Sequence, residues 1–375
     1  MANHITNLNI EAYRGIKSLE IEDLGNINIF VGDNNTGKTS VLEAIQLICN
    51  PSEYNLIRIA RQRERYRTNT RMGLNILDSI LCLFNIEHFN KERNYYHIRI
   101  KGTINNQVGN IDINGRVVNQ LIDLNEVAKY NAIIRSRLNR SIIETEKEIP
   151  TFIGKIDSSF PLNQLSFVDN SMGEFEINEY SRIMQVKDKP SILEVKFIQT
   201  VDHIIEDAFS MLIKDKDLKE KSVELLKEFD ESITDIRYIN DNGRFIPIIE
   251  TNDKNYLPLS MYGDGMKKSL IMLNAIVSVE NGVVLIDEFE TALHTSAMKQ
   301  VFKFILDISR QLNVQLFLTT HSIEAVDKLL ESAEQDRQDI RIVRLKKKDG
   351  ITSARVLNGN EAFHDRKEYN MELRI

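Results

Sequence analysis

The period of the hydrophobic positions changes several times along the chain, and each change marks a predicted element. Apolar and polar residues alternate from Leu8 to Ile10 and from Ile16 to Ile21, which predicts two short strands around Tyr13-Arg14-Gly15. Ile27 to Val31 is a third strand signal, and apolar residues take helical spacing from Thr39 onward. The N-terminal part therefore predicts strands followed directly by a loop and a helix.

The middle of the chain has a different texture. Beyond Pro51 the sequence contains an arginine-rich stretch and then a helical run from Leu74 to Phe84. Hairpin-like alternation follows at Tyr95–Ile100 and at Ile111–Val118. We interpret 51–190 as an insertion of mixed helical and α+β character.

Strand and helix signals then alternate toward the C-terminus. They are Ile192–Ile198, Ile204–Leu212, Leu218–Phe229, Val283–Ile286, Ala297–Leu312 and Val314–Thr319. Alternation of this kind is typical of a mainly parallel sheet covered by helices, so the predicted fold class is α/β. A final hairpin joins Ile340–Leu345 to Thr352–Leu357, and a polar helix follows.

These signals divide the chain into four predicted segments. A head made of 1–50 and 191–330 is interrupted by the insertion at 51–190 and followed by the hairpin and helix at 331–375. The length of 375 residues is enough for a large core.

Bulk composition excludes several classes of protein. Hydrophobic residues make up 42% and charged residues 27%, and no stretch approaches the roughly 18 apolar residues of a membrane helix. The N-terminus lacks a secretion signal, and Cys49 and Cys82 are too few for a disulfide framework, so we expect a cytoplasmic protein with no membrane contact. A net charge of -7 argues against a generally basic coat for nucleic acid.

The loop after the third strand carries the first chemical motif. Gly32-Asp33-Asn34-Asn35-Thr36-Gly37-Lys38-Thr39 fits G-x-x-x-x-G-K-[ST] between a predicted strand and a predicted helix, which disfavours an accidental glycine-rich turn. Such a P-loop wraps its backbone N–H groups around phosphates, Lys38 reaches the terminal phosphates, and Thr39 ligates Mg²⁺. The predicted nucleotide-binding residues are Gly32, Asn34, Asn35, Thr36, Gly37, Lys38, Thr39 and Ser40.

Two carboxylates end a later strand. Val283 to Ile286 runs into Asp287-Glu288, the form of a Walker B segment, and the carboxyl end of such a strand faces the ligand crevice. We expect Asp287 to hold the magnesium shell and Glu288 to orient or deprotonate the attacking water. A strand capped by solvated acids is the alternative, and the P-loop makes it the weaker one.

A histidine follows the next strand. His321 lies in Thr319-Thr320-His321-Ser322, so its imidazole should reach the same sheet edge and bond the γ-phosphate. A structural histidine is the alternative interpretation.

A second glycine turn precedes a helix rich in leucine and isoleucine. Gly263-Asp264-Gly265 would place backbone N–H groups at a helix N-terminus, which is a second anion site. One nucleotide does not need two phosphate cradles, so Gly263 and Gly265 are predicted to reach the γ-phosphate of a partner subunit. An ordinary helix start is the alternative.

In the order P-loop, glycine turn, paired carboxylates and His321, the chain resembles ABC-type ATPases, including the SMC and RecF branches, over about 1–50 and 190–325. Three segments make it similar to the OLD-like AAA ATPases, which include ATPase subunits of bacterial anti-phage systems. They are Leu8–Gly15, Gly263–Lys267 and Asp287–His294. Transporter-type signatures carry a serine where this chain has Gly263, so a hydroxyl contact is lost and slow or partner-dependent hydrolysis is expected.

The resemblance implies an ABC-type P-loop NTPase head that hydrolyses ATP with Mg²⁺ in a homodimer or higher oligomer. The segment after His321 is too short for the nuclease domain of OLD nucleases, so the expected effector is a separately encoded nuclease or toxin. DNA or a phage protein is the candidate trigger. The alternative is a RecF/SMC-like DNA-binding ATPase in DNA repair, and a transporter subunit or a GTPase fits the motifs less well.

Two assignments stay open at this point. Gln199 is the first candidate for the Q-loop glutamine of such enzymes, and Gln164 is the second. The basic run from Arg58 to Arg71 could follow a phosphate backbone, although a solvated helix face is the preferred interpretation, and Lys346–Lys348 is interpreted as a hairpin tip.

Overall fold

The structure is a computed structural model. It describes residues 3–63, 74–85, 87, 94–129, 146–160, 174–181, 191–200, 216–241, 244–253, 255–334 and 336–373. The predicted helix Ile204–Leu212, the alternative Q-loop residue Gln164 and the whole arginine run beyond Arg63 lie outside these ranges.

A six-stranded sheet in the order β15-β14-β3-β13-β12-β8 forms the core sheet. Its strands are β3 (Ile27–Val31), β8 (Val195–Ile198), β12 (Val283–Ile286), β13 (Gln315–Thr319), β14 (Ile340–Lys348) and β15 (Ile351–Asn358). The strands from β8 to β14 are parallel and β15 is antiparallel. The predicted α/β class with a mainly parallel sheet is therefore confirmed.

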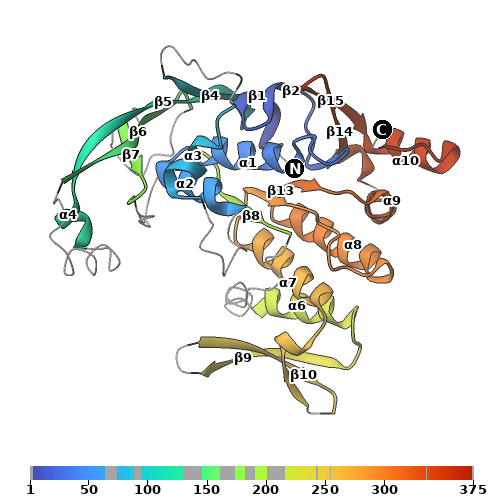
Figure 1. The fold of residues 1–375 in the computed structure, drawn as a ribbon. Helices are drawn as coiled ribbons and strands as arrows, with labels where there is room; N and C mark the ends of the chain where they lie inside the picture. The colour runs from blue at the N-terminus through green and yellow to red at the C-terminus, as the bar shows by residue number, and fades with distance from the viewer. Residues whose placement is uncertain are drawn as a thin grey trace.

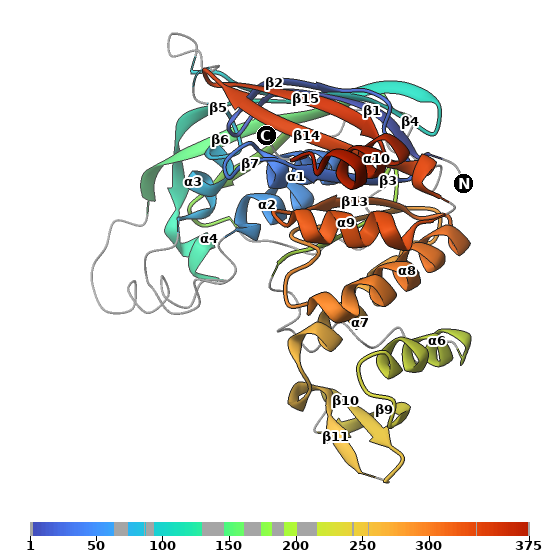
Figure 2. The same cartoon turned by 90° about the vertical axis from the view of Figure 1, so that its right-hand side faces the viewer.

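Helices cover both faces of the core sheet, because alternate residues of each strand point to opposite sides. Phe30 of β3 packs on the side of α1 (Lys38–Cys49), whereas its neighbours Ile29 and Val31 pack on the other side. The helices of that other side are α7 (Asp264–Val277), α8 (Thr295–Gln311) and α9 (Ile323–Ser332) (Figure 2). The P-loop helix and α7 thus lie on opposite faces of one sheet.

A second, antiparallel sheet joins the first residues of the chain to the predicted insertion, and we call it the lobe sheet. Its order is β2-β1-β4-β5-β6-β7. The strands are β1 (Ile5–Tyr13), β2 (Ile16–Ile21), β4 (Tyr96–Ile104), β5 (Gln107–Asp123), β6 (Glu146–Ser158) and β7 (Glu174–Asn178). Ile10 lies opposite Ile100, so the insertion continues a sheet that the N-terminus begins. The far ends of β5 and β6 arch away from the body (Figure 1).

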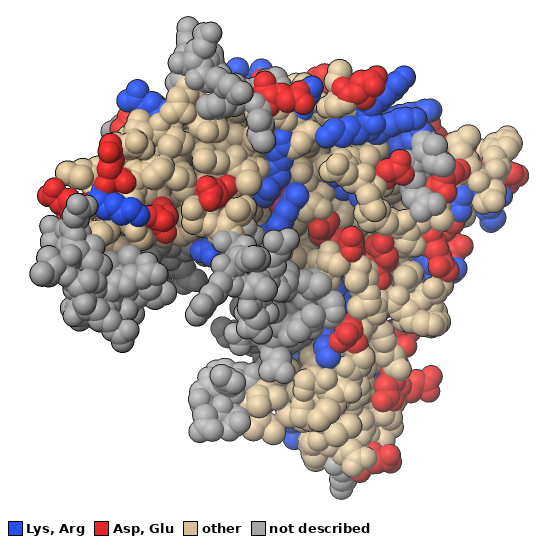
Figure 3. Space-filling view, viewed as in Figure 1, with Lys and Arg blue, Asp and Glu red and all other residues tan. Residues whose placement is uncertain are grey.

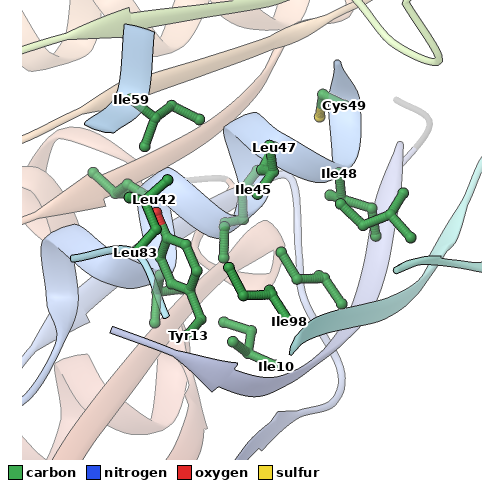
Figure 4. Packing of buried hydrophobic residues seen from close by; sticks show 14 of the residues in the cluster. Ile10, Tyr13, Leu42, Ile45, Leu47, Ile48, Cys49, Ile59, Leu83 and Ile98 are labelled. Carbon is green, nitrogen blue, oxygen red and sulfur yellow. The ribbon is translucent and has the colours of Figure 1, made fainter. Parts of the chain in front are cut away.

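The lobe sheet packs on the helix that follows the P-loop. Figure 4 shows labelled side chains of α1 in one layer with Ile10 and Tyr13 of β1 and with Ile98 of β4. All of these residues are buried. Two short helices, α2 (Glu53–Gln62) and α3 (Ile76–Leu81), close this cluster.

A buried carboxylate fastens α1 to its neighbours. The side chain of Glu43 is 1% exposed and accepts hydrogen bonds from Arg14 Nε at 2.6 Å and from Arg63 Nε at 2.8 Å. Tyr13 donates its hydroxyl to the same carboxylate at 3.3 Å. Burial, followed by the Glu43 charge, raises the pKa of Tyr13, so the phenol keeps its proton. Arg63, from the predicted basic run, is therefore ion-paired at the end of α2.

A third sheet was not predicted. It contains β9 (Ile233–Asp241), β10 (Arg244–Thr251) and β11 (Tyr256–Pro258), all antiparallel, and lies at the bottom of Figure 1 beside α6 (Lys216–Lys227). The turn η4 (Leu259–Met261) leads from it into α7.

The C-terminal hairpin belongs to the core sheet, since β14 pairs with β3. Its turn is shorter than predicted: Asp349 and Gly350 both have positive φ, and Lys346–Lys348 continue β14. The predicted segment 331–375 thus shares a sheet with both parts of the head. The other helices among the described residues are α4 (Leu124–Ala128), η5 (Arg337–Asp339) and α10 (Gly359–Tyr369). Among the described residues, none of the helices combines the length and apolar character needed to cross a membrane.

Candidate functional site: a phosphate loop at the carboxyl edge of the core sheet

The P-loop connects β3 to α1, and two of its glycines have conformations that other residues rarely adopt. Gly32 has a φ of 144°, and a Cβ added there would lie 2.3 Å from the Leu345 carbonyl oxygen of β14. Gly37 has a φ of 99° and forms the N-cap of α1. The loop can therefore stay close to the sheet only with glycine at these positions.

Lys38 lies inside the curve of this loop. Its Nζ donates to the carbonyl oxygens of Gly32 at 2.8 Å and Asp33 at 2.9 Å. Burial lowers the pKa of Lys38, and the charges of Asp287 and Asp33 oppose that shift. A cation held among backbone groups at a helix N-terminus is suited to an incoming polyphosphate.

The other predicted nucleotide contacts lie around the same loop. Asn35 has a φ of 67°, and the Thr36 hydroxyl donates to the Asp33 carbonyl oxygen at 2.9 Å. Ser40 accepts a hydrogen bond from Arg63 Nη2 at 3.1 Å. Asn34 is exposed in the loop itself. The nucleotide contacts of these residues remain predictions.

Asp287 is held between two threonine hydroxyls. Thr39 Oγ1 donates to its carboxylate at distances of 3.1 and 3.2 Å to the two oxygens, and Thr319 Oγ1 donates at 2.6 Å. The predicted metal ligands Thr39 and Asp287 are therefore in direct contact. A hydroxyl and one carboxylate fit Mg²⁺, which takes few protein ligands and completes its shell with water and phosphate oxygens. Binding of Mg²⁺ by these two residues remains a prediction.

The two predicted catalytic residues lie at the same sheet edge. Glu288 follows Asp287 with a φ of 47°, and its backbone N–H donates to Thr319 Oγ1 at 2.9 Å. Its carboxylate accepts from the Thr291 hydroxyl at 3.3 Å. His321 is half-buried in the turn after β13, and its backbone N–H donates to Glu290 Oε1 at 3.2 Å. Their roles in hydrolysis remain predictions.

A cavity of about 350 Å³ lies beside this edge. It is lined by Thr39 and Asp287 and also by Gln199, whose Nε2 donates to the Gln62 carbonyl oxygen at 3.2 Å. Gln199 therefore lies beside Thr39 and Asp287, and its assignment as the Q-loop residue remains a prediction because Gln164 is outside the described residues.

The glycine turn at 263–265, which we call the signature turn, contributes no residue to that cavity. Gly263 is the N-cap of α7, and a Cβ added to it would meet nothing within 4 Å. A Cβ on Gly265 would lie 2.8 Å from the Ala292 carbonyl oxygen. The two glycines therefore have different surroundings: Gly263 faces open space, and Gly265 packs on the loop that follows Asp287.

Sequence reasoning missed the roles of three residues at this site. Thr319 fixes Asp287, Glu43 holds Arg63 next to Ser40, and Glu290 binds the turn of His321. The sequence did hold a signal for Thr319, because a hydroxyl at the end of the strand next to β12 is placed to contact Asp287. Glu43 lies one turn after Thr39 on the P-loop helix, and a carboxylate within an apolar run was its only signal.

Burial raises the pKa of Asp287 above the ordinary aspartate value despite the two hydroxyl donors. Its ionised form at pH 7 therefore destabilises the nucleotide-free fold, and this cost disappears as the pH falls below the raised pKa.

We expect Asp287→Asn to raise the melting temperature by a few degrees at pH 7 without nucleotide, with a smaller gain at acidic pH, and to abolish turnover. Thermal melts from pH 4 to pH 8 measure this; an unchanged or lower melting temperature at pH 7 would contradict it.

Comparison with known proteins agrees with this geometry. Residues 4–326 match the model of the family described as AAA ATPase domain. An ATP/GTP phosphatase from Helicobacter pylori is 25% identical over 385 aligned positions, which cover 98% of this chain and 99% of that protein. The DNA replication and repair protein RecF of Acinetobacter baumannii is 49% identical over 45 residues, 12% of each chain.

A likeness among solved structures is weaker. A structure of an Smc head domain with an extended coiled coil, bound to the C-terminal domain of ScpA and derived from Pyrococcus furiosus, is 12% identical. It covers 98% of this chain and 100% of that chain with a TM-score of 0.49. With the P-loop and Asp287 in contact and a family match over 4–326, the chain belongs to the AAA ATPase domain family and is an enzyme that hydrolyses ATP.

Proposed function

We propose that this ATPase works as a head-to-head dimer of the ABC type, in which the signature turn of each copy completes the nucleotide site of the other. The observation that carries the proposal is the position of α7. Its N-terminus presents an open glycine turn, yet α7 and α1 cover opposite faces of the core sheet (Figure 2). Backbone N–H groups at a helix N-terminus bind anions, so the turn is suited to a phosphate held by another copy.

In the proposed site, Lys38 and the P-loop amides bind the phosphates of ATP. Thr39 and Asp287 would hold Mg²⁺, and the bound ion would offset the phosphate charge. Glu288 takes a proton from the attacking water, and His321 donates to the γ-phosphate. The P–O bond to ADP breaks as the water oxygen bonds to phosphorus, which leaves ADP and inorganic phosphate.

The surface before the signature turn is suited to a protein contact. Tyr256, Leu257 and Met261 are large apolar side chains with 51%, 46% and 75% of their surface exposed. They precede Gly263 within eight residues. A second copy bound at the signature turn would cover them and remove apolar surface from water.

The finer proposal is that the ATP-driven dimer gates a separately encoded nuclease or toxin, as in the OLD-like anti-phage ATPases that the motifs resemble. The lobe sheet supports this, because its long β5 and β6 extend from the body and expose Leu121. None of the predicted nucleotide-binding residues lies on this arm, so it is free to carry a partner.

A DNA-binding role of the RecF/SMC kind is the second candidate. A cavity of about 630 Å³ is lined by Arg14, Lys17, Arg63 and Lys347, and also by Asp78 and Glu87. Arg14 and Arg63 pair with Glu43, and Lys17 pairs with Glu87, so the proposal depends most on Lys347. Figure 3 shows Lys and Arg side chains gathered over the end of the molecule where β2 and β15 lie. Grouped cations of this kind favour an anionic partner such as a phosphate backbone.

The assigned chemistry predicts that Glu288→Gln stops turnover and keeps ATP binding, because an amide cannot accept the proton of the attacking water. Lys38→Ala should lose both turnover and ATP binding, since it removes the cation inside the P-loop. Phosphate release and fluorescent-nucleotide titration measure the two quantities. Turnover by Glu288→Gln at the wild-type rate would show that another group is the base.

The dimer predicts that Gly263→Arg blocks ATP-dependent association while nucleotide affinity of the monomer stays within about twofold, below 0.5 kcal/mol. Gly263 has φ −63° and open surroundings, so the change costs little within the chain. Gly265→Arg is a poorer test, because that residue packs on Ala292.

Light scattering in the Glu288→Gln background, with and without ATP, measures this association. The matched control is Gln107→Arg, an exposed position at the start of β5. Equal dimerisation by Gly263→Arg and the control would reduce the signature turn to an ordinary helix start.

The gating proposal predicts that effector affinity differs between the ATP-bound Glu288→Gln protein and the nucleotide-free protein by about 5- to 150-fold, the usual range of allosteric coupling. Pull-down of the product of the adjacent gene, with Leu121→Asp as a lobe variant, measures it. The DNA-binding alternative is the correct one if effector binding is equal in both states and duplex DNA instead stimulates ATP turnover. In that case Lys347→Glu should remove the stimulation by DNA.

A further inference from the structure

Hydrogen bonds join the loop after β12 to the last residue of β13 and to the turn that follows it. Glu288 N–H donates to Thr319 Oγ1 at 2.9 Å, and Phe289 N–H donates to the Thr319 carbonyl oxygen at 3.1 Å. A third bond comes from a side chain that the proposed chemistry does not use, since Glu290 Oε1 accepts the backbone N–H of His321 at 3.2 Å. Glu290 is thus the one carboxylate among these bonds that reaches the His321 turn.

Glu290 is fixed by its own loop. Leu293 N–H donates to the Glu290 carbonyl oxygen at 3.0 Å, and Thr291 N–H donates to the Glu288 carbonyl oxygen at 3.0 Å. The second carboxylate oxygen, Oε2, is buried and has no hydrogen-bond donor among the described residues. Glu290 is half-buried, and burying one carboxylate oxygen without a donor costs stability, so its presence favours a role other than stabilising the fold.

The same loop contacts the signature helix. A Cβ on Gly265 would lie 2.8 Å from the Ala292 carbonyl oxygen, so the backbones of α7 and of the loop after Asp287 are in close contact. Ala292 is two residues from Glu290. A continuous path of contacts therefore leads from the signature turn through Ala292 and Glu290 to His321.

We propose that Glu290 is a positioning residue for His321: by accepting the backbone N–H of His321, its carboxylate fixes the turn that presents the imidazole to the γ-phosphate. This rests on the proposed role of His321. It adds that the hydrogen-bond acceptor, rather than the negative charge, is what the site requires. It also gives the loop after Asp287 a direct means of moving His321 when α7 shifts.

If Glu290 acts as a hydrogen-bond acceptor, different substitutions at this position should have different effects on kcat. Glu290→Gln keeps an oxygen at the same place, so kcat should stay within about threefold of wild type. Glu290→Ala removes the acceptor. Glu290→Asp keeps the charge, but its side chain is one methylene shorter and its oxygens lie farther from the His321 backbone N–H. Both should lower kcat by about 10- to 100-fold, as loss of an orienting residue commonly does, with KM within about twofold.

A double-mutant cycle tests whether Glu290 acts through His321. If it does, Glu290→Ala in a His321→Ala background should cause no further loss of kcat. Multiplied losses would mean that Glu290 has a chemical role of its own, and the proposal would be overturned. Wild-type turnover by His321→Ala would instead show that the proposed function of His321 is wrong.

A measurement without nucleotide tests the contact itself. Glu290→Ala should speed hydrogen exchange of the peptide that contains His321, because its amide loses an acceptor, while Glu290→Gln should leave exchange unchanged. Glu324→Ala, which removes an exposed carboxylate three residues beyond His321, is the matched control. Equal exchange in Glu290→Ala and the control, or a Glu290→Gln variant as impaired as Glu290→Ala, would overturn the proposal.

Discussion

The site depends on one carboxylate, Asp287, held between the hydroxyls of Thr39 and Thr319. These three residues come from separate parts of the chain and meet because β3, β13 and β12 are adjacent parallel strands that end at one edge. Burial disfavours the charge on Asp287, and each hydroxyl offsets part of that cost. The fold therefore holds in place a charge that it would be more stable without, as is common where a residue is kept for function rather than for stability.

Strands near both ends of the chain help to position the P-loop at this edge. β14 lies directly behind the P-loop, where the Leu345 carbonyl oxygen leaves no room for a side chain on Gly32. On the other side, β1 and β4 of the lobe sheet pack on α1, and Glu43 ties that helix to Arg14 and Arg63. The P-loop is thus positioned from two directions by segments distant in sequence. Because the lobe sheet packs on α1, a movement of that sheet would also move α1.

What the sequence predicted well was local. The P-loop, the Asp287 strand and the His321 strand are each short runs whose chemistry and periodicity are adjacent in the chain, so pattern alone located them. Contacts such as Glu43 with Arg63, or Gly265 with Ala292, depend on how elements pack and have no signal in spacing. The sheet of β9, β10 and β11 was missed because its exposed Ile239 and Tyr256 interrupt the expected alternation of buried and polar positions.

The signature turn gives the proposed dimer its most specific physical requirement. Most helix N-caps supply a side-chain oxygen, but Gly263 has none, so the cap of α7 offers an anion its backbone N–H groups. Backbone amides bind phosphate only at hydrogen-bond distance, which demands close approach by the other copy. Open space around Gly263 permits that approach, and the tight packing of Gly265 on Ala292 passes any resulting shift to the loop that carries Glu288 and Glu290. Engagement of two copies and alignment of the hydrolytic residues are therefore, in this proposal, one mechanical event.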